Sequence, residues 1–344
     1  MSLLHGLSTP IAFGTLQWGT TWIDHTILSA HGVISESEAR KIVAETTKSG
    51  VTVWDTAEGY GGGTSEKRLG RLLSKDAIVM TKFLPVPWRY SHGCFERAVR
   101  ESCRRLQIEC IPIYLLHSPV HWRPIEFWVE AAAICKRKGL IKAMGLSNCN
   151  ADQVRRAVLA GQKYGIDVVT NQVHYSLLCY NSKSLQEMES TCRELNVKIV
   201  GFSPIGQGLL TDGLTTERLA SNRPARMLHL KLDDLFDLRS CLKLLSLKYQ
   251  KSMAQIALNW CICHEIIPLV GCRSLNQAKD SLGCLGWKLD TDDVKRLDRL
   301  ALSKSTLESP SWRRSIFVTL FGLVMLSCRF LDYIGLGMVK HAWL

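Results

Sequence analysis

Several signals that mark other classes of protein are missing from this sequence of 344 residues. No Gly-x-Gly-x-x-Gly motif follows the first apolar run, which argues against a Rossmann-type fold. The 13 cysteines include no Cys-x-x-Cys pair, and Cys261 and Cys263 are too close together to bind a metal on their own. We therefore expect no metal site. An odd number of irregularly spaced cysteines favours a reducing compartment, with the thiols serving as small core residues.

Concentrated charge is also missing. The chain carries a net charge of +12, yet Lys and Arg form no run of five or more. We expect a solvated basic surface and a site for an anionic small molecule, and no nucleic-acid binding. The first residues lack the basic and apolar regions of a secretory signal, and the first apparent strand begins near Ile11. We therefore expect no cleaved targeting peptide and a cytoplasmic protein.

Short apolar runs alternate with longer segments of helical period. Eight runs have the composition of strands: Ile11–Leu16, Val51–Trp54, Ala77–Met80, Ile111–Leu116, Ile141–Leu146, Val168–Thr170, Val197–Gly201 and Ile266–Val270. Helices are predicted over Ser35–Lys48, Ser65–Ser74, Glu96–Leu106, Glu126–Arg137, Ala151–Tyr164, Ser184–Leu195 and Ser252–Cys263. Such alternation implies a parallel sheet with right-handed crossovers. Eight repeats favour an α/β fold of the closed (β/α)₈ TIM-barrel type.

Two segments depart from this pattern. We expect one barrel domain over residues 1–305, followed by a hydrophobic tail over 306–344. Within the barrel, the long connection between Gly206 and Asp233 lacks strong periodicity, and loops of this length are usually functional lids or disordered. The glycines of residues 61–63 resemble a phosphate loop in isolation. They lack its Lys-Ser/Thr ending, so a flexible turn is the better interpretation.

Polar side chains stand where the predicted strands end. Strands two, three and four end in Asp55, Lys82 and His117, and the next two end in Ser147 with Asn148 and in Asn171 with Gln172. Each one alone could be a turn, cap or loop residue. Catalytic groups of barrel enzymes stand at the carboxyl ends of the strands, so five consecutive strand ends of this kind favour an active site there.

Longer motifs around these residues carry a family resemblance. They are DTAEGYG at 55–61 with SEKRLG at 65–70, TKF at 81–83, LLHSP at 115–119, GLSN at 145–148, NQVHYS at 171–176, FSPIGQG at 202–208 and GCRSLNQA at 271–278. In this order and spacing, the chain resembles the aldo-keto reductases over about residues 10–300. VPWR at 86–89 and IALNW at 256–260 are similar to a branch of that family found in plastids and cyanobacteria.

The resemblance implies an NADPH-dependent oxidoreductase that reduces aldehydes and ketones to alcohols. Tyr60 would be the general acid, and Lys82 would lower its pKa. Asp55 would hold Lys82 charged and in place. His117 would orient the carbonyl and donate to the oxyanion that develops as hydride arrives.

The resemblance also implies where NADPH or NADP binds. Ser147, Asn148 and Gln172 would hold the carboxamide, and Phe202 would stack on the nicotinamide where many relatives have tyrosine. Arg273 and Ser274 would bind the 2′-phosphate, as an Arg and a hydroxyl at a helix N-terminus can. Further contacts are implied for Ser203, Ile205, Gln207 and Gln277. Ser281 replaces an asparagine of many relatives, which leaves the adenine contact in doubt.

Substrate and partners are less well defined. Five aromatic residues could line an apolar mouth or cover the edge of the core, namely Trp18, Trp22, Phe83, Trp88 and Trp122. An apolar mouth would favour aromatic or medium-chain carbonyl substrates. Arg218, Arg223 and Arg226 could close over the pyrophosphate or be solvated loop charges. The alternative function is a non-catalytic NADPH-binding regulator similar to potassium-channel β subunits. Those typically lack the family histidine, so the presence of His117 favours an enzyme.

The tail contains 13 consecutive uncharged residues, Ile316–Cys328, preceded by Arg313 and Arg314, and its apolar character resumes as far as Val339. A spanning helix needs about 20 predominantly apolar residues. Three interpretations stay open. The tail folds across the barrel mouth, or residues 316–339 attach the protein to a membrane with the arginine pair at its anionic surface, or the tail is disordered or not genuine coding sequence.

Overall fold

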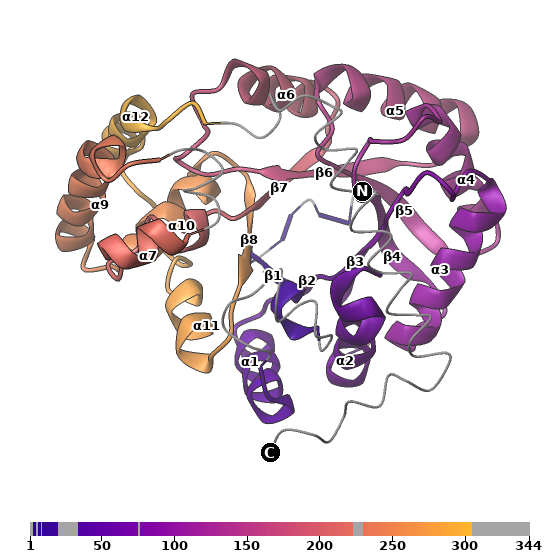
Figure 1. The fold of residues 1–344 in the computed structure, drawn as a ribbon, viewed down its shortest axis with the longest axis horizontal. Helices are drawn as coiled ribbons and strands as arrows, with labels where there is room; N and C mark the ends of the chain where they lie inside the picture. Colours follow the sequence, from indigo (N-terminus) through magenta and orange to yellow (C-terminus); the bar gives the residue numbers. More distant parts are fainter. Residues whose placement is uncertain are drawn as a thin grey trace.

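The computed structural model describes residues 3–4, 6–7, 9–19, 34–74, 76–222 and 230–304. Eight parallel strands form a closed barrel in sequence order (Figure 1). They are β1 (Ala12–Gly14), β2 (Val53–Asp55), β3 (Ile78–Phe83), β4 (Ile111–Leu116), β5 (Ile141–Ser147), β6 (Val168–His174), β7 (Lys198–Phe202) and β8 (Ile267–Gly271). Because β1 pairs with both β2 and β8, no strand edge is left open. The predicted (β/α)₈ TIM barrel is confirmed.

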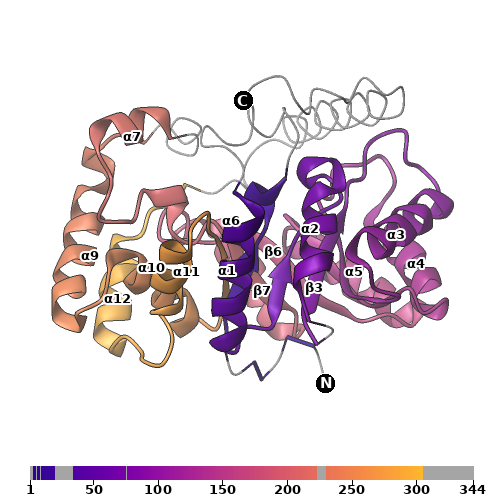
Figure 2. The same cartoon turned by 90° about the horizontal axis from the view of Figure 1, so that it is seen from below.

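Helices form a ring outside the strands (Figures 1 and 2). The predicted ones are present as α1 (Glu36–Lys48), α2 (Thr64–Leu72), α3 (His92–Leu106), α4 (Ile125–Arg137), α5 (Ala151–Tyr164), α6 (Lys183–Glu194) and α10 (Met253–Cys263). N-cap residues define two of these helix starts. Asn150 forms a capping box at the start of α5, and Ser252 forms one at the start of α10. The structure adds α7 (Thr216–Ser221), α9 (Phe236–Tyr249), α11 (Leu275–Leu282) and α12 (Thr291–Leu300).

Helix α9 escaped the sequence analysis because its apolar residues do not form one stripe. Leu238, Leu242 and Leu245 pack inward, whereas Phe236 and Leu247 are 67% and 68% exposed on the opposite side. A helix that is apolar on both sides gives a weak 3.6-residue period. The long connection over 206–233 holds only short turns of helix among its described residues, including η4 (Gly206–Gly208), α7 and the start of η5 (Asp233–Leu235).

The core has two layers. Inside the barrel, alternate strand residues such as Val53, Met80 and Ile113 form one cluster. A larger cluster fills the space between strands and helices. Trp18 and Phe83, considered above as candidates for the mouth, are 1% and 0% exposed and belong to this outer cluster. They therefore cover the core edge.

The tail over 306–344 lies outside the described residues, as do Trp22, Arg223 and Arg226. Within the part of the chain that the structure describes, no helix has the length and apolar character to cross a bilayer.

Candidate active site

The side chain of Lys82 is the centre of a buried polar cluster. Lys82 lies on β3 and is 0% exposed. Its Nζ donates to Asp55 Oδ1 at 2.6 Å, to the carbonyl oxygen of Thr56 at 2.8 Å and to the Tyr60 hydroxyl at 3.3 Å. Asp55 ends the neighbouring strand β2, and Tyr60 opens the short helix η3 (Tyr60–Gly63) just beyond it. Lys82 is thus in direct contact with both of the other residues.

The glycines after Tyr60 make the sharp turn that returns the chain to the barrel wall. Gly61, Gly62 and Gly63 have φ angles of 58°, 61° and 94°, in the left-handed region that glycine adopts without strain. A Cβ atom on Gly63 would lie 2.6 Å from the side chain of Arg105. These glycines form a turn that sets the position of Tyr60 and then leads into α2, in agreement with the interpretation as a turn.

Burial and the charges inside this cluster act in opposite directions on its pKa values. Burial raises the pKa of Tyr60; Lys82 opposes this effect, and the negative charge of Asp55 adds to it. Lys82 lowers the pKa of Tyr60, as expected, but desolvation exceeds the attraction of the ammonium and the net shift is upward. Burial lowers the pKa of Lys82, but Asp55 and Tyr60 outweigh burial and raise it overall. At neutral pH Tyr60 keeps its proton and Lys82 its charge.

His117 faces the tyrosine from the end of β4. Its ring centroid lies 6.0 Å from that of Tyr60, edge to face, with 77° between the ring planes. Burial lowers the pKa of His117 to about 3, and the charge on Lys82 contributes in the same direction. The Nδ1 atom is buried and has no hydrogen-bond partner among the described residues. A neutral imidazole with one N–H therefore stands beside the tyrosine ring.

Gln172 has a contact that sequence reasoning missed. Its Nε2 donates to Asp55 Oδ2 at 2.7 Å, across the barrel from β6. Both carboxylate oxygens of Asp55 are thus occupied, one by Lys82 and one by Gln172. The signal in the sequence was a polar residue inside a segment that forms a strand, because a polar group that becomes buried there needs a hydrogen-bond partner.

The predicted nicotinamide residues gather on the adjacent strand ends. Asn148 Nδ2 donates to Ser147 Oγ at 3.0 Å and to the His117 carbonyl oxygen at 3.3 Å. Asn148, Ser203 and Gln207 have φ angles of 59°, 54° and 52°. Such angles are uncommon outside glycine, and this chain also has them at helix C-caps such as Gln107 and Gln250. Asn148 and Ser203 directly follow β5 and β7, so each of these strands ends at a residue in the left-handed region.

A second group of predicted residues lies at the N-terminus of α11. Ser274 is the N-cap, and its Oγ accepts from the Gln277 backbone N–H at 3.2 Å. Gln277 Oε1 accepts from the Arg273 backbone N–H at 2.9 Å. The Arg273 guanidinium makes no ion pair with a described residue. An Arg beside a helix N-terminus fits an anionic group such as a phosphate. Glu38 of α1, which was not predicted here, accepts from the Leu275 N–H at 2.6 Å.

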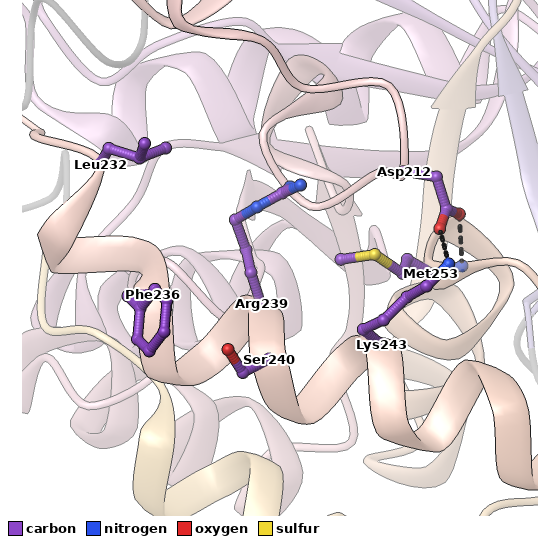
Figure 3. A pocket seen from close by; sticks show the side chains of 7 residues that line it. All are labelled: Asp212, Leu232, Phe236, Arg239, Ser240, Lys243 and Met253. Atoms are coloured by element: carbon purple, nitrogen blue, oxygen red, sulfur yellow. Dashed lines mark hydrogen bonds and ion pairs between the residues drawn. The ribbon is translucent and has the colours of Figure 1, made fainter.

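A cavity of about 410 Å³ lies apart from these residues, beside α9 (Figure 3). Arg239 Nη1 donates to the carbonyl oxygens of Leu209 and Thr211 at 2.6 and 2.9 Å. Asp212 accepts from Lys243 at 3.0 Å and from the Met253 N–H at 3.2 Å (Figure 3). These contacts fix the segment that follows the predicted pyrophosphate residues 202–208.

The rim of the barrel carries exposed aromatic residues. Trp122 is 61% exposed, stacks on Tyr90 at 6.5 Å and donates from Nε1 to the Pro87 carbonyl oxygen at 3.3 Å. Trp88 packs on a small apolar cluster of Leu84, Val86 and Val120. Unlike Trp18 and Phe83, these two tryptophans lie on the loops after β3 and β4. No group of His, Cys, Asp and Glu in the described ranges is arranged to hold a metal ion.

Proteins of similar sequence include aldo/keto reductases. The family model for the aldo/keto reductases matches residues 10–302. The chloroplastic pyridoxal reductase of Arabidopsis thaliana is 31% identical over 328 residues, which cover 90% of this chain and 87% of that protein. Aldo-keto reductase yakc (NADP(+)) of Schizosaccharomyces pombe is 26% identical over 78% of this chain and 83% of its own.

Solved structures share the fold. Glycerol dehydrogenase from Gluconobacter oxydans superposes with a TM-score of 0.71 at 21% identity, over 86% of this chain and 93% of that one. An aldo-keto reductase of the silkworm Bombyx mori in complex with NADP gives a TM-score of 0.65 at 21% identity, over 88% and 92%.

Proposed function

The chain belongs to the aldo/keto reductase family, and from this premise we propose that it reduces a small carbonyl compound with NADPH, using Tyr60 as the proton donor. The observation that carries the proposal is the contact of one buried ammonium, Lys82 Nζ, with both Asp55 and the Tyr60 hydroxyl. A buried pair of this kind keeps the lysine charged beside a protonated phenol.

The residues divide the work of the reaction. Tyr60 holds a proton at neutral pH and gives it to the carbonyl oxygen as negative charge develops there. Lys82 stabilises the tyrosinate that remains, so it lowers the barrier even though the resting pKa of Tyr60 is raised. Neutral His117 donates one N–H to the same oxygen and orients it. Asp55, held by Gln172, keeps Lys82 in place.

The residues proposed to bind the cofactor form two groups, one at the ends of β5, β6 and β7 and one at the N-terminus of α11. Bound NADPH supplies the hydride. Ser147, Asn148 and Gln172 would hold its carboxamide and Phe202 its ring, while Ser203, Ile205 and Gln207 would contact the pyrophosphate. Arg273, with Ser274 and Gln277 at the α11 N-terminus, would hold the 2′-phosphate. NADP appears in the name of one relative and in the complex of another, which supports this choice.

An aromatic aldehyde is the substrate class that we propose. The exposed Trp122 and the half-buried Trp88 supply flat apolar surface at the rim. The plant relative is named for its action on pyridoxal, a pyridine aldehyde.

The test is NADPH consumption with pyridoxal, benzaldehyde and a medium-chain aldehyde, measured beside NADPH binding in the absence of substrate. Turnover that is fastest with the two aromatic aldehydes is the expected result. Tight NADPH binding without turnover on any of the three aldehydes would instead favour a non-catalytic regulator.

A further inference from the structure

His174 is a buried histidine that the mechanism above does not use. It is the last residue of β6 and lies two positions beyond Gln172, so its side chain is on the same face of the strand. Gln172 reaches Asp55 on that face, which places His174 at the mouth of the barrel. The residue is only 7% exposed.

The imidazole of His174 is packed flat against Phe202. The two residues are direct neighbours in the β6–β7 register. Their ring centroids lie 5.6 Å apart with 23° between the planes. Phe202 is the residue proposed to stack on the nicotinamide, so one face of its ring is already covered by His174. A cross-strand aromatic pair of this kind restricts the orientation of both rings.

One ring nitrogen of His174 is buried without a partner. Nδ1 has no hydrogen-bond partner within the described residues. A buried N–H without an acceptor is costly, so the proton belongs on Nε2. Burial also lowers the pKa of His174 to about 4. The ring is therefore neutral at physiological pH, and no charge disturbs its flat contact with Phe202.

We propose that His174 is a positioning residue for the nicotinamide half of the cofactor, which acts by fixing the plane of the Phe202 ring. This inference rests on the proposed function. It requires that Phe202 meets the nicotinamide, and that the phosphate end at Arg273 is held independently of His174.

The test compares two ligands and two variants. NADPH contains the nicotinamide, whereas adenosine 2′,5′-bisphosphate contains only the phosphate-bearing half. His174→Leu removes the flat ring, and His174→Phe retains one. For His174→Leu we expect a rise of about 2–10-fold in the NADPH dissociation constant and less than about a twofold change for the bisphosphate. His174→Phe should restore NADPH binding to near the wild-type value.

Each other outcome contradicts the proposal. Unchanged NADPH binding in His174→Leu would show that His174 has no such role. Equal weakening of both ligands in both variants would reduce it to general structural support. Selective loss of NADPH in both variants would assign the effect to the imidazole nitrogens and overturn the stacking argument. A wild-type protein that binds neither ligand would instead refute the proposed function itself.

Discussion

Replacing Tyr60 by phenylalanine removes one oxygen atom and tests the proposed chemistry directly. Among the described residues the hydroxyl has a hydrogen bond from Lys82 Nζ, at 3.3 Å. Lys82 keeps its bonds to Asp55 and to the Thr56 carbonyl oxygen, at 2.6 and 2.8 Å, so no buried charge is left without a partner. The free energy of unfolding should therefore fall by no more than about 0.5–1.5 kcal/mol.

The effect on the reaction should be far larger. Loss of a general acid typically slows a reaction about 10²–10⁴-fold, which corresponds to roughly 3–5 kcal/mol in the barrier. NADPH binding should be nearly unchanged, because the proposed cofactor contacts lie at and just after the ends of β5, β6 and β7 and at the N-terminus of α11.

The assay is a single-turnover measurement of NADPH fluorescence loss after mixing with an aldehyde, which separates chemistry from product release. Tyr164→Phe, at the end of α5, is the matched control and should react like the wild type. Near-full single-turnover rates in Tyr60→Phe would refute the assignment of the proton donor.

Four further perturbations probe other parts of the molecule. Lys82→Met should abolish turnover and lower the free energy of unfolding by about 3–5 kcal/mol in urea, because it leaves buried Asp55 without its cation; a fully stable variant would contradict the ion pair. Arg273→Ala should raise the NADPH dissociation constant about 10–100-fold and barely affect NADH; equal losses in a fluorescence titration would place Arg273 away from the 2′-phosphate. His117 has a folded pKa of about 3, well below the unfolded value of about 6.5, so its contribution to stability is complete above pH 6.5 and is lost as the pH falls toward 3. Urea unfolding at pH 7 and pH 5 should show a loss that is smaller in His117→Asn, and equal losses would be evidence against a buried neutral imidazole. A chain ending at Ser305 should stay folded and bind NADPH, and unfolding of this truncated chain would show that the domain boundary is wrong. Flotation of the full-length and truncated chains with anionic liposomes tests whether the tail attaches the protein to a membrane.

Much of the fold could be predicted because each strand and most helices carry a local signal. All eight apolar runs became strands of the barrel, and Ser252 and Asn150 mark helix starts that are readable from a few adjacent residues. Helix α9 was missed because its apolar residues face both the core and solvent. The aromatic residues were ambiguous for a similar reason, since a Trp after a strand can turn inward like Trp18 or outward like Trp122.

Local patterns along the chain are enough to specify the barrel and the identity of the polar residues at its strand ends. Hydrophobic period and strand-end position depend only on neighbours along the chain, so Asp55, Lys82 and His117 can be placed at one end of the barrel from the sequence alone. Tyr60, on the turn after β2, is identified through a motif.

The bonding and titration of these residues depend instead on contacts between distant parts of the chain. Barrel closure brings Gln172 onto Asp55 and carries Glu38 to Leu275, 237 positions away, and the pairing of β6 with β7 stacks His174 on Phe202. The same closure partly buries Tyr60, and the resulting desolvation reverses the pKa direction that the charge of Lys82 alone would give. Desolvation and long-range contact depend on which surfaces meet across the barrel, and no local pattern in the sequence records that.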